Sequence, residues 1–131
     1  MKSYLIDTNY FLRLLLKDNL PQYKKVRELF DLGLENKVEL YSTVAVFFEI
    51  YWVLSSFYKK DKKKCTDVLG NILAMNFLRF ENSTVLQFTL KLYTYYAVDL
   101  EDCYNLAVFA KEDIDDLATF DKKVKTLSKK L

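Results

Sequence analysis

The acidic residues are the side chains of this 131-residue chain best suited to chemistry, because the sequence contains no histidine. The absence of histidine excludes Ser-His-Asp and Cys-His nucleophile mechanisms and removes the usual general base at neutral pH. The two cysteines, Cys65 and Cys103, form neither a disulfide framework nor a thiolate–imidazole zinc site. Catalysis would therefore depend on carboxylates, on Lys, Tyr, Ser or Thr, or on a metal ion held by oxygen ligands.

Two acids directly follow short, mostly apolar segments that are typical of buried strands. Asp7 comes after residues 4–6, and Asp121 comes after residues 117–120. In open α/β folds, ligands bind at the carboxyl ends of the strands, which favours a functional role for both acids. The alternative is that each acid only caps the helix that follows it.

Glu49 is the single acid in residues 44–54, where every other residue is apolar. A helix that is apolar on all sides is expected to be buried. A lone carboxylate in such a helix costs several kcal/mol unless it is paired, protonated or bound to a metal. The alternative to a metal is a salt bridge to a Lys or Arg elsewhere in the chain.

A further group of acids lies on the helix predicted over residues 100–111. At 100° per residue, Glu101, Asp102, Asn105 and Glu112 fall opposite the apolar face, and Asp99 lies near Asp102. The alternative is a solvated face whose acids are favoured by the helix dipole.

Together, these separated carboxylates could converge at one edge of a sheet. Clustered like charges repel one another and raise each other's pKa unless a cation neutralises them. Oxygen-only ligands suit Mg²⁺ or Mn²⁺, and such an ion activates water for attack on a phosphodiester. The acids therefore predict metal-dependent phosphoryl chemistry rather than acyl transfer.

The elements that must position these acids alternate between short strands and longer helices. We expect strands at 4–6, 38–41, 78–80 and 117–120, and helices at 10–16, from Pro21 to about Gly33, at 44–54, from Asp61 or Thr66 to about 75, at 83–96 and at 100–111. This alternation predicts an α/β sandwich around a small parallel sheet. The length and the lack of a linker predict a single domain over residues 1–131.

Charge and hydropathy say less about partners. The net charge is +2, and lysines cluster at 59–64 and 122–130, where they either attract phosphate groups or form a solvated surface. No apolar run exceeds five residues, whereas a membrane-spanning helix needs about 20. The N-terminus meets Asp7 after three apolar residues and is unlike a secretory signal, so we expect a cytoplasmic protein without a membrane partner.

Four blocks of the sequence resemble, in order and spacing, those of PIN-domain nucleases. The blocks are Tyr4-Leu5-Ile6-Asp7-Thr8-Asn9, the run 44–54 around Glu49, Val98-Asp99-Leu100-Glu101-Asp102-Cys103 and Leu117-Ala118-Thr119-Phe120-Asp121. The size of the chain is similar to that of the VapC-like ribonuclease toxins of prokaryotic toxin–antitoxin pairs. The resemblance implies a three-layer α/β/α sandwich with a short, mostly parallel sheet of four or five strands.

The resemblance also implies the site and its partners. The metal-binding and catalytic acids would be Asp7, Glu49, Asp102 and Asp121, with Asp99, Asn9 and Thr119 in supporting positions. The activity would be that of a Mg²⁺- or Mn²⁺-dependent endoribonuclease acting on tRNA, rRNA or mRNA, with lysines such as those at 59–64 holding the RNA. The family further implies a homodimer and a small antitoxin that blocks the acidic cleft.

Other functions remain open at this point. A haloacid-dehalogenase-type phosphatase needs a second Asp where this chain has Asn9, and a receiver domain needs paired acids that residues 4–6 lack. A non-catalytic binding module with a PIN-like fold would use the many aromatic side chains for its partners. An RNA-processing nuclease that is not a toxin would have the same site.

Overall fold

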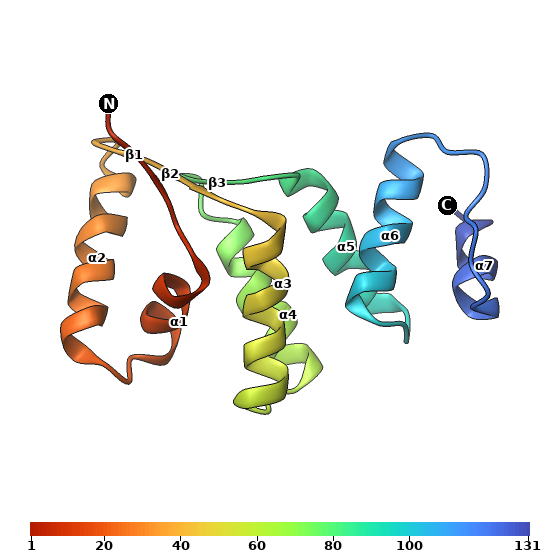
Figure 1. Cartoon of the computed structure of the whole chain (residues 1–131), viewed down its shortest axis with the longest axis horizontal. Helices are drawn as coiled ribbons and strands as arrows, with labels where there is room; N and C mark the ends of the chain where they lie inside the picture. Colours follow the sequence, from red (N-terminus) through yellow and green to blue (C-terminus); the bar gives the residue numbers. More distant parts are fainter. The chain divides into compact units, whose positions relative to one another are not determined.

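The computed structural model describes residues 1–131, which divide into two units, Met1–Asn82 and Ser83–Leu131. The first unit contains β1 (Ser3–Leu5), α1 (Thr8–Leu16), α2 (Leu20–Leu34), β2 (Glu39–Ser42), α3 (Val44–Trp52), the π-helical turn η1 (Val53–Phe57), α4 (Lys62–Leu73) and β3 (Leu78–Phe80) (Figure 1). The second unit contains α5 (Ser83–Tyr95), α6 (Leu100–Lys111) and α7 (Lys122–Ser128).

The sheet of the first unit is parallel, with the strand order β1-β2-β3. Tyr4 is paired with Leu40, and Leu40 with Leu78. Each crossover between neighbouring strands carries helices, as parallel pairing requires, so the prediction of an α/β fold with a parallel sheet is confirmed. The carboxyl ends of all three strands meet at one edge, where Asp7 follows β1.

The strand next to Asp7 differs from its prediction. Residues 4–6 were expected to form a fully buried strand, but β1 spans Ser3–Leu5 and its Leu5 side chain is 69% exposed. The reason is the position of β1 at the edge of the sheet, where it has a neighbour on one side only. Ile6, just after β1, is the buried residue of this segment.

The prediction of a strand over residues 117–120 is wrong. The segment has no regular structure, and the Phe120 side chain is fully exposed. A strand needs a neighbour to satisfy its backbone hydrogen bonds, and the second unit contains no other strand. The sheet therefore has three strands, where four or five were expected.

Aromatic packing fixes the position of α1 in the first unit. The Phe11 ring is completely buried, and its centroid lies 5.9 Å from that of Phe30 on α2 and 5.7 Å from that of Phe80 on β3. Phe77 extends this cluster, with its ring 6.0 Å from Phe30. The start of α1, where Asp7 lies, is thereby held against both a neighbouring helix and the sheet.

Polar side chains, rather than glycines, mark the helix starts. Asn19 caps α2, Thr43 caps α3 and Asp61 caps α4, each by accepting a backbone N–H. Of the two predicted starting points for α4, Asp61 and Thr66, the structure has Asp61. Both glycines lie inside helices. At Gly33, α2 approaches β2 so closely that an added Cβ would lie 2.7 Å from Leu40 Cδ1, which leaves no room for a larger residue.

The second unit includes a helix, α7, that the sequence interpretation raised only as the alternative role of Asp121 as a cap. Its lysines suggested a solvated tail, yet α7 forms and buries Val124 and Leu127. The available signal was an Asp cap at Asp121 followed by apolar residues three apart. Helices α5 and α6 pack on each other and bury, among others, Leu86 and Leu106.

Two further predictions concern the cysteines and membranes. Cys65 and Cys103 are both buried, as expected for small hydrophobic side chains. Burial raises the pKa of the Cys65 thiol, which keeps it protonated and unreactive at neutral pH.

No helix combines the length and the apolar character needed to cross a membrane.

Candidate functional site

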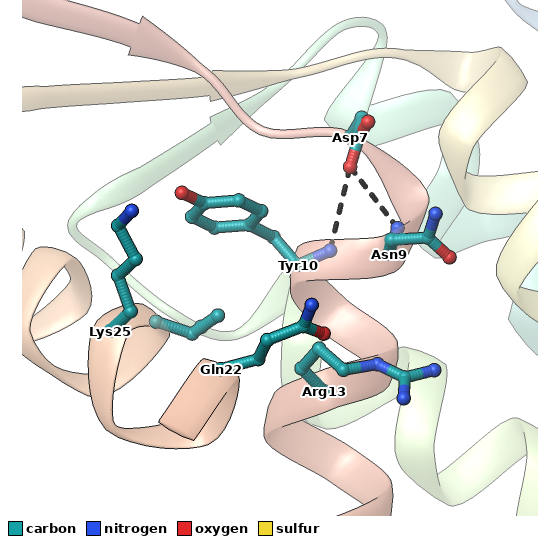
Figure 2. Close-up of a pocket in the computed structure, with 7 residues that line it drawn as sticks. Asp7, Asn9, Tyr10, Arg13, Gln22 and Lys25 are labelled. Carbon is teal, nitrogen blue, oxygen red and sulfur yellow. Dashed lines mark hydrogen bonds between the residues drawn. The ribbon is translucent and has the colours of Figure 1, made fainter. Parts of the chain in front are cut away.

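Asp7 is exposed at the carboxyl end of β1 and caps α1. Its Oδ1 accepts hydrogen bonds from the backbone N–H groups of Asn9, at 3.1 Å, and Tyr10, at 3.4 Å (Figure 2). Asn9 thus contacts Asp7 through its backbone. Because both bonds end on one oxygen, Oδ2 of Asp7 has no hydrogen bond within the chain. Capping and ligand binding are therefore compatible in this carboxylate.

A hollow of about 430 Å³ opens beside Asp7, between α1 and the first half of α2. Its lining residues are Asp7, Asn9, Tyr10, Arg13, Gln22, Lys25 and Val26 (Figure 2). Arg13 donates a hydrogen bond to Asp18 at 3.0 Å, so its charge is already balanced. Lys25 has no such partner, which leaves one unpaired cation near the carboxylate of Asp7.

Glu81 is an acid at the same sheet edge that the sequence interpretation missed. It follows β3 directly, whereas Asp7 follows β1 after one residue, and this position after an apolar strand was the available signal. Its Oε1 accepts a 3.0 Å hydrogen bond from the backbone N–H of Val44, at the start of α3. Ser42 joins the same edge to β1 by donating to the Ile6 carbonyl at 2.8 Å. These two residues position α3 and β1.

The expectation of a buried Glu49 is wrong. Helix α3 buries Phe47 and Ile50, whereas Ala45, Glu49 and Trp52 form an exposed face. Composition alone could not show this, because apolar residues occupy both faces. Glu49 forms no ion pair within the first unit, and the predicted salt bridge to a more distant Lys or Arg stays a prediction. Its carboxylate is accessible, on a helix that packs against α1.

The second unit gathers acids around Asp102. Burial raises the pKa of Asp102, and the negative charges of Asp99, Asp121 and Glu101 raise it further. Asp99 is the N-cap residue of α6, yet its side chain accepts no capping hydrogen bond. Such an accumulation of negative charge is what a bound cation would relieve.

Asp121 repeats the arrangement of Asp7. Its Oδ1 accepts a 3.0 Å hydrogen bond from the backbone N–H of Val124 and caps α7. The backbone N–H of Asp121 in turn donates to Oγ1 of Thr119 at 3.1 Å. Oδ2 of Asp121 has no hydrogen bond within the chain, so this carboxylate is also anchored through one oxygen and open at the other.

Lysines of the C-terminal run hold the segment around Asp121 in place. Lys125 donates to the Leu117 carbonyl at 2.7 Å and pairs with Asp116. This lysine lowers the pKa of Asp116 through the hydrogen bond and its charge. Lys123 donates to the Ala97 carbonyl at 2.9 Å. Two lysines of the run thus have partners within the unit.

The donor set fits a hard divalent cation. Every candidate ligand is a carboxylate oxygen, and Mg²⁺ and Mn²⁺ prefer such ligands. Within neither unit do three acidic or cysteine side chains gather closely enough to form a complete metal cage. Mg²⁺ usually needs only one or two carboxylates, because it keeps several water ligands.

Comparison with known families identifies the chain. The family model described as PIN domain matches residues 4–130, which include all the candidate acids in both units. No curated protein and no solved structure gives a significant match. The match covers nearly the whole sequence, and the parallel α/β sheet agrees with it. The chain therefore belongs to the PIN-domain family, whose members are typically metal-dependent nucleases.

Proposed function

We propose that the chain is an endoribonuclease that hydrolyses RNA phosphodiester bonds with Mg²⁺ or Mn²⁺. The observation that carries this proposal is the PIN-domain match over residues 4–130. The negative surroundings of Asp102 support it, because burial and neighbouring carboxylates both disfavour an ionised Asp102 without a cation.

We further propose Asp7, Glu49, Asp102 and Asp121 as the metal-binding and catalytic acids. Asp7 and Asp121 each keep one carboxylate oxygen without a hydrogen bond, and Glu49 is exposed without an ion pair within the first unit. Asp99 serves as a secondary ligand, since its side chain does not cap its helix. Asn9 and Thr119 support the site through their contacts with Asp7 and Asp121.

The chain's own residues contribute orientation and charge. When bound, a divalent cation supplies an activated water nucleophile and stabilises the charge on the departing 3′ oxygen. Asp7 and Asp121 are held by helix backbone N–H groups through Oδ1, so Oδ2 of each keeps a fixed direction. Lys25 attracts the phosphate backbone beside Asp7. Hydrolysis by this route leaves a 5′ phosphate on the downstream fragment.

The chemistry of the product ends tests this function. Labelled RNA cut by the purified protein with Mn²⁺ should carry 5′-phosphate and 3′-hydroxyl ends. A contaminating or metal-independent ribonuclease attacks with the 2′-hydroxyl and leaves a 2′,3′-cyclic phosphate instead. Cyclic phosphate ends that persist in EDTA would contradict the proposal, and 5′-phosphate ends that disappear in EDTA would support it.

We also propose that the protein is the toxin of a VapBC-type pair, with a small antitoxin as its partner. A second hollow of about 450 Å³ lies between the C-terminal end of α1, η1 and α4. Leu16, Leu54 and Ile72 contribute apolar lining, and Lys60 and Lys64 contribute positive charge. This combination suits an amphipathic segment with acidic residues. Co-purification with the product of a small neighbouring gene, lost in a Lys60→Glu/Lys64→Glu variant, would support the assignment.

A homodimer is the remaining proposal on partners. Trp52 and Phe57 are 64% and 81% exposed on consecutive turns of α3 and η1. Large apolar side chains exposed together favour a protein interface. Light scattering should give twice the mass of 15.6 kDa, and a monomer at all concentrations would contradict this proposal.

A further inference from the structure

The hollow beside Asp7 contains polar groups that metal binding does not use. The Tyr10 hydroxyl, the side-chain amide of Gln22 and the Lys25 ammonium form no hydrogen bond or ion pair within the first unit. Figure 2 shows the Tyr10 ring extending from α1 on the same side as Lys25, with the Gln22 amide directed toward α1. Three unpaired polar groups from two helices therefore line one hollow next to a candidate metal ligand.

The size and lining of this hollow suit one nucleotide. Its volume of about 430 Å³ lies within the usual range of about 300–1,000 Å³ for small-molecule sites. Val26 lines the hollow but is only 2% exposed, so the Tyr10 ring is the apolar surface that a base can contact. Unstacked bases of RNA bind on such rings, and their edges are read by polar side chains. An amide is suited to this because it both donates and accepts.

We infer that this hollow binds one unstacked nucleotide of the RNA, next to the phosphodiester that Asp7 serves. Tyr10 stacks on the base, Gln22 hydrogen-bonds to its edge, and Lys25 pairs with a phosphate of the strand. This inference rests on the proposed nuclease function and adds to it the side chains that hold one base beside Asp7. The enzyme then prefers single-stranded or looped RNA, because a base within a duplex must first leave the stack.

The charges of the hollow favour a nucleotide within a strand over a free anion. Asp7 is negative and Arg13 is already paired with Asp18, which leaves Lys25 as the unpaired cation of the lining. One lysine opposite one carboxylate gives little net attraction for inorganic phosphate. Affinity must come largely from the base, through stacking and hydrogen bonding.

Binding without cleavage tests the inference independently of activity. A fluorescently labelled single-stranded hexaribonucleotide is titrated with the protein in EDTA, beside the same strand paired with its complement. We expect the single strand to bind at least tenfold more tightly than the duplex. Tyr10→Leu should weaken single-strand binding on the order of tenfold, the effect of losing one base–aromatic stack, and Tyr10→Phe should restore it.

Matched variants assign the other two contacts. Lys25→Ala should weaken binding of every sequence, whereas Lys24→Ala, an exposed neighbour on α2 outside the hollow, should not. Gln22→Ala should reduce the difference in affinity among hexamers of A, C, G and U. Equal binding of single strand and duplex, or unchanged binding by Tyr10→Leu, would overturn the inference.

A cleavage experiment distinguishes failure of this inference from failure of the proposed nuclease function. An RNA with one mapped cut site is compared with the same RNA lacking the base next to that site. With Mn²⁺, loss of the base should slow cleavage on the order of tenfold. Equal cleavage of both RNAs would overturn the nucleotide site and leave the nuclease intact. If no RNA is cut, the nuclease proposal fails, and the EDTA titrations still decide whether the hollow binds a base.

Discussion

At the scale of single residues, helix capping and ligand binding are compatible roles for Asp7 and Asp121. The sequence left open whether each acid caps a helix or binds a ligand. Both side chains cap, through Oδ1 alone, and the capping bonds fix the direction of the second oxygen. The caps would therefore hold a flexible carboxylate in place at the proposed site.

Replacing Asp7 separates the two roles. Asn caps a helix about as well as Asp, whereas Ala costs about 0.5–2 kcal/mol of stability. Asp7→Asn should therefore keep the free energy of unfolding near that of the wild type, and Asp7→Ala should lower it by that amount. Loss of a residue that only contacts a metal ligand typically costs ~10–100-fold in activity. Both variants remove a proposed direct ligand and should therefore lose more cleavage activity than that.

Urea unfolding and RNA cleavage measured on the same preparations check this prediction. Asp121→Asn is measured in the same way, because Asp121 caps α7 in the second unit as Asp7 caps α1. If Asp7→Asn cleaves RNA as fast as the wild type, Asp7 is only a cap.

Asp102 predicts a pH-dependent stability. Its pKa lies above the ordinary value of 3.8 in the folded chain, because of burial first and then of Asp99, Asp121 and Glu101. Above that raised pKa, ionised Asp102 destabilises the folded state, and the penalty disappears as the pH falls below the ordinary value. Asp102→Asn should therefore raise the Tm of the metal-free protein at pH 7 and leave it unchanged near pH 3.

Thermal unfolding in EDTA measures this effect, with Asp115→Asn in an exposed loop as the control. Adding Mn²⁺ should raise the Tm of the wild type more than that of Asp102→Asn. A lower Tm for Asp102→Asn at pH 7 would show that the carboxylate is structural.

At the scale of the elements, local signals predicted helices better than strands. The caps Thr43 and Asp61 act within three residues of the groups they bind, so the sequence nearby specifies them. A strand depends on a neighbouring strand that is distant in the sequence. The sequence of residues 117–120 therefore predicts a strand, although the segment forms none. Helix α3 shows the same limit: its exposed face depends on what packs against Phe47 and Ile50, and Glu49 was placed wrongly for that reason.

The two glycines give an opposite pair of predictions for helix stability. A Cβ on Gly33 would lie 2.7 Å from Leu40 Cδ1, whereas Gly70, in α4, has no atom within 4 Å of the added carbon. Gly33→Ala should destabilise the chain by about 1–3 kcal/mol, as overpacking does. Gly70→Ala should stabilise it by about 0.5–1 kcal/mol, because alanine favours a helix interior. Urea unfolding of both variants measures these values, and a destabilised Gly70→Ala would contradict the packing of α4.

At the scale of the whole molecule, the PIN-domain match spans both units, and so do the candidate acids. The order of the acidic blocks along the sequence was enough to indicate the family. The same order could not show the hollow beside Asp7, because that hollow depends on how α2 packs against α1 through Phe11 and Phe30.

The distribution of lysines over the molecule predicts which of them bind RNA. Lys60 and Lys64 lie in a hollow at the C-terminal end of α1, whereas Asp7 precedes its N-terminus. The run 59–64 therefore does not line the Asp7 hollow, and its contact with RNA stays a prediction. Lys25→Gln should reduce the slope of log affinity against log salt by about 0.7, as for one lost single-strand phosphate contact. Lys60→Gln/Lys64→Gln should leave it unchanged, and the reverse result would place the RNA along α4.

Cleavage of total RNA by the purified protein tests the central claim most directly. Wild-type protein with Mn²⁺ or Mg²⁺ is compared with the same protein in EDTA and with Asp7→Asn, which keeps the helix cap. Cleavage in the first sample that is lost in both controls is the result we expect of a metal-dependent nuclease served by Asp7. Cleavage that persists in EDTA or in Asp7→Asn, or no cleavage at high protein concentration with either metal, would contradict the claim.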